Sequence, residues 1–381
     1  MTRYRFDQIA ENSTAKKKPE ESDRDRYVGL EHLDPGTLEV TRWGAEVTPK
    51  GDKLLMKKGD VLFGRRRAYQ KKVGIAPFDG IFSAHGMVLR PKADVVDPMF
   101  FPFFISSDIF LDEAIRVSVG SLSPTANWKD LRTLEFDLPS PGKQRELAGI
   151  LSEAESLKGH YRKMLTTCDD VVKSQFVEIF GEPAENPKGW ETSSLTSLGS
   201  CKNGMNFKSK ESGIELPSLG VGDFKDRSVI NDVSEMGRIN LDDEPAEGYF
   251  LKDGDIVFVR SNGNKELVGR CLAVYPHGEK AVFSGFCIRL RVESDKVRIP
   301  YLIWALKQPS MRQQMFGRGA NVQNLNQKLM AKVDVPIPPL AEQDRFLALV
   351  SIVDKSKFAI QKALDELNAT TKKILNQELG L

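Results

Sequence analysis

Hydrophobic and polar positions follow the same pattern twice along the chain. The segment KKGDVLFGRR at 57–66 resembles KDGDIVFVRS at 252–261, and IFSAHGMVLR at 81–90 resembles VFSGFCIRLR at 282–291. In each copy a Gly-Asp pair precedes a short apolar run, which is typical of a turn that leads into a strand. Because the matches occur in the same order, the pattern predicts two copies of one mixed α/β domain.

Two apolar stretches, 99–115 and 301–316, come after these strands and favour helices. We expect their aromatic side chains to fill the core of each domain rather than to stack on bases.

Two longer amphipathic stretches follow the two copies. The apolar residues of the first recur at steps of three and four, as in a heptad seam: Leu147, Ile150, Ala154, Leu157, Tyr161, Met164, Cys168 and Val171. The second keeps a similar rhythm with Phe346, Leu349, Val353, Ile360, Leu364, Leu367 and Ile374. Each stretch predicts a helix of about 35 residues, roughly 50 Å long.

The connections between these helices determine their predicted direction. A single amphipathic helix would leave its apolar stripe in water, so the two stripes are expected to pack together. The first helix leads to the second domain and the second must return, which makes the pair antiparallel. The predicted fold class is α+β: two pseudo-symmetric mixed α/β domains separated by two long antiparallel coiled-coil helices. The predicted boundaries are 1–140 and 183–338 for the domains, and 141–182 and 339–381 for the helices that act as spacers.

Charge and motifs limit the classes of function. Lys and Arg number 55 and Asp and Glu 53, so the net charge is only +2 and DNA affinity would have to come from local basic patches. The cysteines form no C-x-x-C pair and the histidines show no zinc spacing, so we expect no disulfide or metal site. There is no phosphate loop, dinucleotide fingerprint, H-E-x-x-H or G-x-S-x-G motif, so we expect no catalytic site and no bound cofactor. No apolar run suits a signal peptide or a membrane span, which predicts a cytoplasmic protein without membrane contact.

The segments that lead into the long helices are similar to those of a known family. PIPPLAEQDRF at 336–346 and PSPGKQREL at 139–147 are two copies of a proline-rich helix start, and the first copy reads as two residues shorter. LPSLGVGDFKD at 216–226 and PKGWE at 187–191 support the match. Over essentially its whole length the chain resembles the specificity subunits of type I restriction–modification systems, with two target-recognition domains.

This resemblance implies a non-catalytic subunit that reads a bipartite, asymmetric double-stranded DNA target. Such a subunit binds two methyltransferase subunits, which carry S-adenosylmethionine, and two restriction subunits driven by ATP and Mg²⁺. The assembled complex would be an adenine-specific DNA methyltransferase and ATP-dependent endonuclease. Two alternatives stay open: the specificity subunit of a related enzyme that cuts on both sides of its site, or a coiled-coil protein-interaction scaffold that binds no DNA.

Candidate DNA-binding residues lie in polar loops, since phosphates attract cations and base edges pair with planar polar groups. In the first domain they are Arg65, Arg66, Arg67, Tyr69, Lys71, Lys72, Ser121, Ser123, Thr125 and Asn127. In the second domain they are Lys202, Asn206, Lys208, Arg260, Ser261, Asn262, Asn264, Lys265, Arg318, Asn321, Gln323 and Asn324. The competing interpretation is a solvated charged face with ordinary turn and helix-cap chemistry. The lone His85 is expected in a core or turn role.

Overall fold

The computed structural model describes residues 1–207, 213–225, 227–315 and 324–380. The chain forms two compact units, of which unit 1 contains Met1–Thr167 and Lys357–Leu381 and unit 2 contains Cys168–Ser356. Each unit holds one α/β domain and part of each of two long helices, α5 (Pro141–Phe180) and α9 (Leu340–Leu379).

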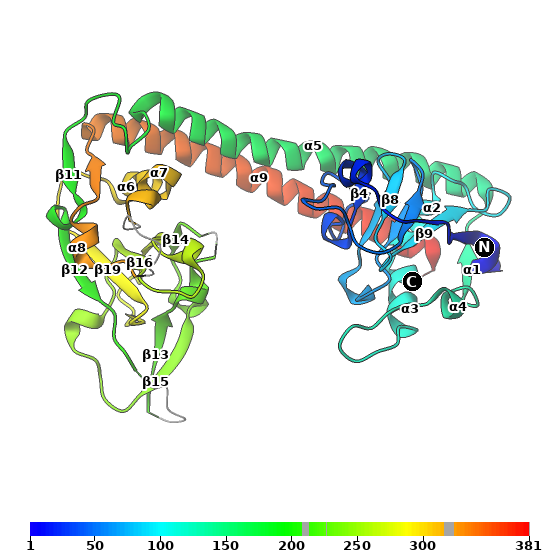
Figure 1. Cartoon of the computed structure of the whole chain (residues 1–381), viewed down its shortest axis with the longest axis horizontal. Helices are drawn as coiled ribbons and strands as arrows, with labels where there is room; N and C mark the ends of the chain where they lie inside the picture. Colours follow the sequence, from blue (N-terminus) through cyan, green and yellow to red (C-terminus); the bar gives the residue numbers. More distant parts are fainter. Residues whose placement is uncertain (208–212, 226, 316–323, 381) are drawn as a thin grey trace. The chain divides into compact units, whose positions relative to one another are not determined.

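The domain of unit 1 contains two four-stranded sheets and a two-stranded ribbon (Figure 1). Its strands are β1 (Thr2–Arg5), β2 (Ala10–Ser13), β3 (Lys16–Lys17), β4 (Tyr27–Val28), β5 (Lys53–Met56), β6 (Val61–Phe63), β7 (Val73–Ile75), β8 (Gly80–Phe82), β9 (Met87–Pro91) and β10 (Glu135–Leu138). Its short helices are α1 (Phe6–Ile9), α2 (Phe101–Ser106), α3 (Asp108–Arg116) and α4 (Trp128–Leu131). The sheets have the strand orders β2-β9-β6-β7 and β3-β5-β8-β4, and β1 pairs with β10.

The domain of unit 2 repeats this plan. Its strands are β11 (Thr192–Ser194), β12 (Gly199–Asn203), β13 (Ile214–Leu219), β14 (Val229–Ile230), β15 (Gly237–Leu241), β16 (Asp255–Val259), β17 (Cys271–Val274), β18 (Val282–Phe283), β19 (Cys287–Val292) and β20 (Asp334–Pro336). Its short helices are α6 (Ile299–Lys307), α7 (Pro309–Gln314) and α8 (Gln327–Met330). The order β12-β19-β16-β17-β14 reproduces β2-β9-β6-β7 with one strand added, and β11 pairs with β20 as β1 pairs with β10. The predicted repeat of a mixed α/β domain is therefore confirmed.

The repeated Gly-Asp pairs form the turns that begin β6 and β16. Gly59 and Gly254 have φ angles of 91° and 83°, a left-handed conformation that costs glycine little. The carboxylates of Asp60 and Asp255 each accept the backbone N–H of the residue three positions earlier, at 2.8 and 2.7 Å. The sequence motif is thus a hydrogen-bonded turn in both domains.

The same two aspartates join β6 to β9 and β16 to β19 through buried ion pairs. Asp60 accepts two hydrogen bonds from Arg90, at 2.8 and 2.9 Å, and Asp255 accepts two from Arg291, at 2.8 and 2.6 Å. Two-pronged arginine–carboxylate pairs fix geometry as well as charge. They hold the strands from which the loops described below emerge.

The two predicted apolar helices are each broken into two. Ser107 separates α2 from α3, and its hydroxyl accepts the backbone N–H of Phe110 as an N-cap. Pro309 opens α7 after α6 and has no N–H with which to continue the preceding helix. The prediction that the aromatic residues fill the core is confirmed, because Phe104, Phe110 and Tyr301 are fully buried.

The long helices begin with one shared device, a buried glutamine in the first turn. Gln144 accepts the N–H of Asp97 at 2.7 Å and donates to the carbonyl of Pro139 at 2.9 Å. Gln343 accepts the N–H of Arg298 at 2.8 Å and donates to the carbonyl of Pro338 at 2.7 Å. Both glutamines follow their proline by five positions, so the two starts align without a gap. The interpretation that the first copy is two residues shorter is wrong.

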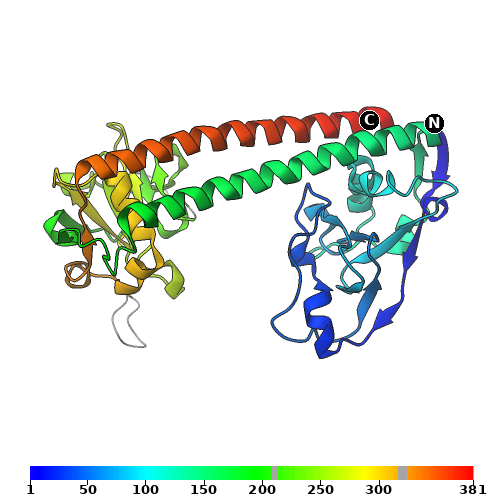
Figure 2. The ribbon, with the colours of Figure 1, turned by 90° about the horizontal axis from the view of Figure 1, so that it is seen from above.

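Within each unit, parts of α5 and α9 lie side by side and run in opposite directions (Figures 1 and 2). In unit 1, Lys143 of α5 pairs with Glu378 of α9 at 3.2 Å, and Lys158 further along α5 bonds to the earlier residue Thr371 at 2.8 Å. In unit 2, Phe180 at the end of α5 packs against Phe346 at the start of α9, with ring centroids 5.5 Å apart. The antiparallel prediction is confirmed in both places.

The predicted seam of α5 is only partly correct. Ile150, Leu157, Met164 and Val171 are between 41% and 48% exposed, so they lie outside the seam. The buried positions are shifted by one residue: Leu151, Lys158 and Val172 are buried instead. The error arose because the seam in unit 1 contains charged residues, which a search for apolar periodicity passes over.

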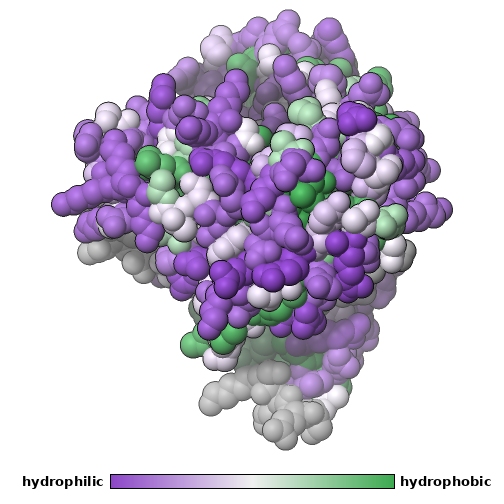
Figure 3. Space-filling view, turned by 90° about the vertical axis from the view of Figure 1, so that its right-hand side faces the viewer, coloured by the Kyte–Doolittle hydropathy of each residue, from purple (hydrophilic) through white to green (hydrophobic). Residues whose placement is uncertain are grey.

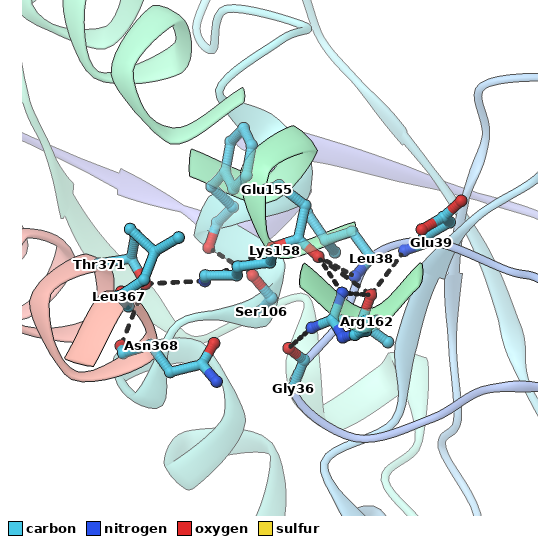
Figure 4. A network of polar contacts seen from close by, with 12 residues as sticks. Gly36, Leu38, Glu39, Ser106, Glu155, Lys158, Arg162, Leu367, Asn368 and Thr371 are labelled. Carbon is cyan, nitrogen blue, oxygen red and sulfur yellow. Dashed lines mark hydrogen bonds and ion pairs between the residues drawn. The ribbon is translucent and has the colours of Figure 1, made fainter. Parts of the chain in front are cut away.

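Figure 4 shows this polar part of the seam. The Lys158 ammonium donates to the Thr371 hydroxyl and lies 3.5 Å from the Glu155 carboxylate. Glu155 also accepts a hydrogen bond from the Thr37 hydroxyl at 3.0 Å and lies 3.6 Å from Arg162. Burial lowers the pKa of Lys158, and the opposing effect of Glu155 is smaller. The contact between the helices is therefore partly polar in unit 1, where leucines of both helices also join the core, and aromatic in unit 2.

Candidate nucleic-acid interface

In unit 1, three loops meet at the end of β6. They are the segment Arg65–Arg67 after β6, the turn Ser83–Gly86 between β8 and β9, and the loop 118–127 before α4, and together they are called loop cluster 1. The carbonyl of Arg65 accepts the N–H of Ala126 at 3.0 Å, and the N–H of Arg66 donates to the carbonyl of His85 at 3.2 Å. Residues far apart in the sequence are thus fixed to one another by their backbones.

The side chains of loop cluster 1 bring cations to its surface. Arg66 and Arg67 are exposed, with Arg66 Nη1 3.4 Å from His85 Nε2 and Arg67 Nε 3.4 Å from the Ser123 hydroxyl. Arg65 reaches the carbonyl of Ala84 at 3.5 Å, and its Nε atom is buried without a hydrogen-bond partner among the described residues.

The pKa of His85 is lowered, first by partial burial and then by the positive charges of Arg66 and Arg65. Its imidazole is therefore neutral near pH 7, with one nitrogen that donates a hydrogen bond and one that accepts.

Unit 2 contains loop cluster 2 at the end of β16. It consists of Arg260 and Ser261 after that strand, the turn Ser284–Phe286 between β18 and β19, and Asn324 with Leu325 before α8. The carbonyl of Arg260 accepts the N–H of Leu325 at 2.8 Å, and the N–H of Ser261 donates to the carbonyl of Phe286 at 3.2 Å. Arg260 Nη1 lies 3.4 Å from the carbonyl of Gly285.

The two loop clusters share one hydrogen-bond pattern. Arg65 corresponds to Arg260 in its carbonyl bond to the third loop and in its side-chain bond to the turn. An isolated β-bridge joins Arg66 to Thr125 in cluster 1, and the matching bridge joins Ser261 to Asn324 in cluster 2. Each domain therefore presents the same backbone frame with its own set of side chains.

Several predicted residues of unit 1 are bound elsewhere or only border the cluster. Lys71 forms ion pairs with Asp108 at 2.9 Å and Asp112 at 2.7 Å, and Lys72 donates to the carbonyl of Leu30. The remaining predicted residues lie near the surface: Tyr69 and Ser121 are exposed, the Thr125 hydroxyl donates within its own loop, and Asn127 occupies the N-cap position of α4 without a side-chain cap bond.

In unit 2 the predicted asparagines divide between the cluster and turn chemistry. Asn206 lies against Gly285, so it borders loop cluster 2. Asn262 and Asn264 accept backbone N–H groups two residues further on, which is the competing interpretation for them. Lys202 lies over the Tyr249 ring at 4.3 Å.

Lys265 begins the short 3₁₀ helix Lys265–Leu267. Lys208, Arg318, Asn321 and Gln323 fall outside the described residues.

The sequence interpretation missed two residues of these clusters. His85 lies in a turn, as expected, but its side chain is exposed beside Arg66. Phe286 occupies the matching place in unit 2 and is 61% exposed. His85 and Phe286 occupy the same position in the alignment of IFSAHGMVLR with VFSGFCIRLR. A lone histidine and a phenylalanine nevertheless carry no DNA-binding signal in a sequence.

Metal sites and membrane spans have recognisable structural features. Over the described residues no three or more His, Cys, Asp or Glu side chains gather as a metal site would require. Nor is any helix in that part of the chain both long enough and apolar enough to cross a membrane. Figure 3, in which unit 1 faces the viewer, shows a mainly hydrophilic face with small, separate hydrophobic groups.

A duplicated α/β domain with a frame of loops at one strand end, followed each time by a long helix, defines a two-site binding protein. The family model of the type I restriction modification DNA specificity domain matches residues 4–160 and 187–377. The chain belongs to this family.

Two curated relatives are specificity subunits. The chain is 25% identical over 355 residues to the type I restriction enzyme StySPI specificity subunit of Salmonella potsdam. The matched region covers 87% of this chain and 74% of the relative. The chain is 24% identical over 362 residues to the type I restriction enzyme EcoKI specificity subunit of Escherichia coli (strain K12), with the same two coverages.

Two solved structures share the fold. One comes from work on complex assembly and conformational transition of the type I R-M system, with a TM-score of 0.62, 19% identity, and coverage of 99% of this chain and 97% of that chain. The other is the type I restriction–modification S subunit from M. genitalium, with a TM-score of 0.52, 16% identity, and coverage of 100% and 96%.

Proposed function

We propose that this chain is the non-catalytic subunit that reads DNA sequence in a type I restriction–modification complex. Each domain reads one half of a bipartite, asymmetric duplex target through its loop cluster. The observation that carries the proposal is the shared frame, in which Arg65 and Arg260 make the same backbone and side-chain hydrogen bonds. Membership of a DNA specificity family supports DNA as the ligand of that frame.

The chemistry of the clusters suits duplex DNA. The exposed guanidinium groups of Arg66 and Arg67 can neutralise phosphates or grip guanine with two hydrogen bonds. Ser261 and Asn324 in cluster 2 offer small polar groups to base edges. Because the side chains of the two clusters differ, the two half-sites would differ as well.

The proposal extends to partners and cofactors. Two methyltransferase subunits would supply S-adenosylmethionine and two restriction subunits would supply ATP and Mg²⁺, while this chain binds none of these cofactors. The complex would act in the cytoplasm, away from membranes, as an adenine-specific methyltransferase and an ATP-dependent endonuclease. The absence of phosphate-loop and dinucleotide motifs in the sequence supports this division of labour.

Adenine methylation mapped across the host genome, with and without the gene for this chain, tests the proposal. We expect one two-part motif with an unspecified gap to lose methylation when the gene is deleted and to regain it on complementation. A methylation pattern that is the same in both strains would contradict the proposal.

Binding of the assembled methyltransferase complex to duplex DNA across a range of salt concentrations separates the alternatives. Neutralised phosphates predict that the logarithm of affinity falls linearly with the logarithm of salt concentration. A protein-interaction scaffold would show no such slope. Purification of the native complex shows which subunits accompany this chain. An ATP-dependent restriction subunit among them would favour a type I enzyme over an enzyme that cuts on both sides of its site.

A further inference from the structure

Each loop cluster contains a turn that is built in the same way. The N–H of His85 donates to the Ser83 hydroxyl at 3.3 Å, and the N–H of Phe286 donates to the Ser284 hydroxyl at 3.3 Å. The N–H of the serine donates in turn to a backbone carbonyl at the end of the neighbouring parallel strand. The acceptor is the carbonyl of Val28 in β4 or of Leu219 in β13, at 3.0 Å in both units. The two turns therefore hold His85 and Phe286 in matching backbone positions.

The carbonyls of these residues are also fixed by the frame. The His85 carbonyl accepts the N–H of Arg66 at 3.2 Å, and the Phe286 carbonyl accepts those of Arg260 and Ser261 at 2.8 and 3.2 Å. With both the N–H and the carbonyl engaged, the backbone is set and the side chain projects from the cluster. In both units that side chain is exposed, and for Phe286 the exposed fraction is 61%.

The Phe286 ring gains little from folding, because most of it stays exposed to solvent. The nearby residues Phe283 and Cys287 are buried and pack in the core of unit 2, whereas Phe286 stays in solvent. Burial of such a ring against a partner would recover the hydrophobic free energy that the folded chain leaves unused.

We propose that His85 and Phe286 are specificity-determining residues, each reading one base of the half-site that its own domain contacts. Phe286 packs against the methyl group of a thymine in the major groove, and His85 bonds to the polar edge of a purine. This inference rests on the proposed DNA-reading function and assigns base contacts within it.

The chemistry of the two side chains supports this assignment. A phenyl ring forms no hydrogen bond with a base edge, and the thymine methyl is the apolar group that the major groove presents. A neutral imidazole donates and accepts at once, so it can pair with the N7 acceptor of a purine. Partial burial, and then the charges of Arg66 and Arg65, lower the pKa of His85. Because Arg66 can only donate, His85 Nε2 is the nitrogen that accepts from it, and the N–H on Nδ1 is left to donate to N7.

The first experiment maps methylation motifs written by the whole methyltransferase complex with single substitutions in this chain. Phe286→His and Phe286→Ala should change or relax one base in one half of the motif and leave the other half intact. His85→Phe should alter one base in the opposite half. Val229→Ala, which truncates another exposed apolar side chain of unit 2, is the matched control and should preserve the motif.

The second experiment isolates the methyl contact. Once the motif is known, each thymine of the half-site affected by Phe286→Ala is replaced by uracil in a synthetic duplex. At one position the change should weaken binding of the wild-type complex about four-fold, the factor for one methyl group at about 0.8 kcal/mol. The Phe286→Ala complex should bind the thymine and uracil duplexes equally.

The outcomes separate this inference from the function on which it rests. If the wild-type complex methylates a bipartite motif and Phe286→Ala writes the same motif with equal affinity, Phe286 is not a specificity residue and the proposed function stands. If no uracil duplex distinguishes wild type from Phe286→Ala, the thymine contact is wrong. If the wild-type complex itself binds no duplex DNA, the proposed function has failed.

Discussion

Among the described residues, the two loop clusters differ in their exposed side chains and share the backbone hydrogen bonds that join the strand end to the turn and to the third loop. Arg66 of cluster 1 corresponds to Ser261 of cluster 2, and Thr125 corresponds to Asn324, yet each pair forms the same β-bridge. The frame depends on backbone groups, whose chemistry does not change with sequence. The difference teaches that one backbone architecture can carry two different sets of exposed side chains, because the frame is held mainly by backbone groups.

Buried polar side chains near the clusters keep the frame in place. The Asp60–Arg90 and Asp255–Arg291 pairs hold the central strands, and the glutamines Gln144 and Gln343 hold the starts of the long helices. Substitutions at these sites should damage folding, whereas substitutions at the exposed cluster residues should damage only binding. Variants of both kinds test that division, from the largest expected effect to the smallest.

Removal of the aspartate that joins the central strands should lower the free energy of unfolding more in unit 2, at Asp255, than in unit 1, at Asp60. The Asp255 side chain is 1% exposed and that of Asp60 is 8% exposed, so Asp255→Ala removes the more deeply buried of the two carboxylates and leaves Arg291, which is 24% exposed, without its partner. We expect Asp255→Ala to lower the free energy of unfolding of unit 2 by about 3–5 kcal/mol, and Asp60→Ala to cost unit 1 less. Hydrogen–deuterium exchange with mass spectrometry measures each domain separately. Asp243→Ala, at an exposed site, should change stability by less than about 0.5 kcal/mol.

The first-turn glutamines provide the next comparison. Gln343 bonds to the N–H of Arg298 and to the carbonyls of Lys296 and Pro338, while Gln144 bonds to Asp97 and Pro139. Because unsatisfied buried groups cost about 1–3 kcal/mol each, Gln343→Ala should destabilise unit 2 by roughly 2–4 kcal/mol and Gln144→Ala should destabilise unit 1 by less. Gln343→Glu keeps the acceptor but sets a buried carboxylate oxygen against the carbonyls of Lys296 and Pro338, so unit 2 should exchange at least as fast as in Gln343→Ala. Equal protection in all three proteins would show that the glutamine does not hold the helix start.

The exposed cationic side chains of cluster 1, Arg66 and Arg67, should matter for binding and not for folding, whereas Arg65 also takes part in the frame. Replacement of Arg65, Arg66 and Arg67 by Ala should weaken DNA binding of the complex and reduce its salt slope by up to about 2.7, which is about 0.9 for each phosphate that is no longer neutralised. Arg260→Ala should reduce the slope by at most about 0.9. Lys71→Ala is the control, because Asp108 and Asp112 already neutralise this lysine. A triple variant with the wild-type slope would remove Arg65–Arg67 from the interface.

Much of the fold could be predicted from the sequence, because the pattern of apolar positions carries it. The strands around Val61–Phe63 and Asp255–Val259 follow Gly-Asp turns, and the two long helices show clear periodicity. The loops around Arg65 and Arg260 could be found as well, since a polar segment after a repeated strand is visible in the sequence. Their partners could not all be named, because contacts between distant loops are made by backbone groups.

One incomplete expectation and one error have a common physical origin. The expected turn position of His85 is correct, but a single histidine gives no signal of exposure, and only the fold places its side chain beside Arg66. Leu157 was placed in the helix seam because it is apolar, yet Lys158 is the buried residue. In both cases polar contacts from distant parts of the chain decided the position, and these contacts leave no periodicity in the sequence.

Lys158 itself provides the smallest expected effect. Lys158→Met keeps the length of the side chain and removes its charge, while Glu155 keeps its contacts with Thr37 and Arg162. Since replacement of a buried charge by a similar apolar group is often neutral or stabilising, we expect unit 1 to gain between about 0 and 1 kcal/mol. Lys163→Met, at an exposed site of the same helix, should be neutral within about 0.5 kcal/mol.

The effect of Lys158→Met should also depend on pH. The pKa of Lys158 in the folded protein lies below its ordinary value of 10.5, because burial disfavours the charged form. Below the folded pKa, Lys158 is protonated in both states and the folded protein bears the full cost of the buried charge. As the pH rises through the folded pKa toward 10.5, the folded protein releases the proton first and the cost fades. The stability difference between Lys158→Met and wild type, measured by urea unfolding, should therefore be largest near pH 7 and shrink at alkaline pH; a difference that grows with pH would mean that the seam of unit 1 depends on the lysine charge.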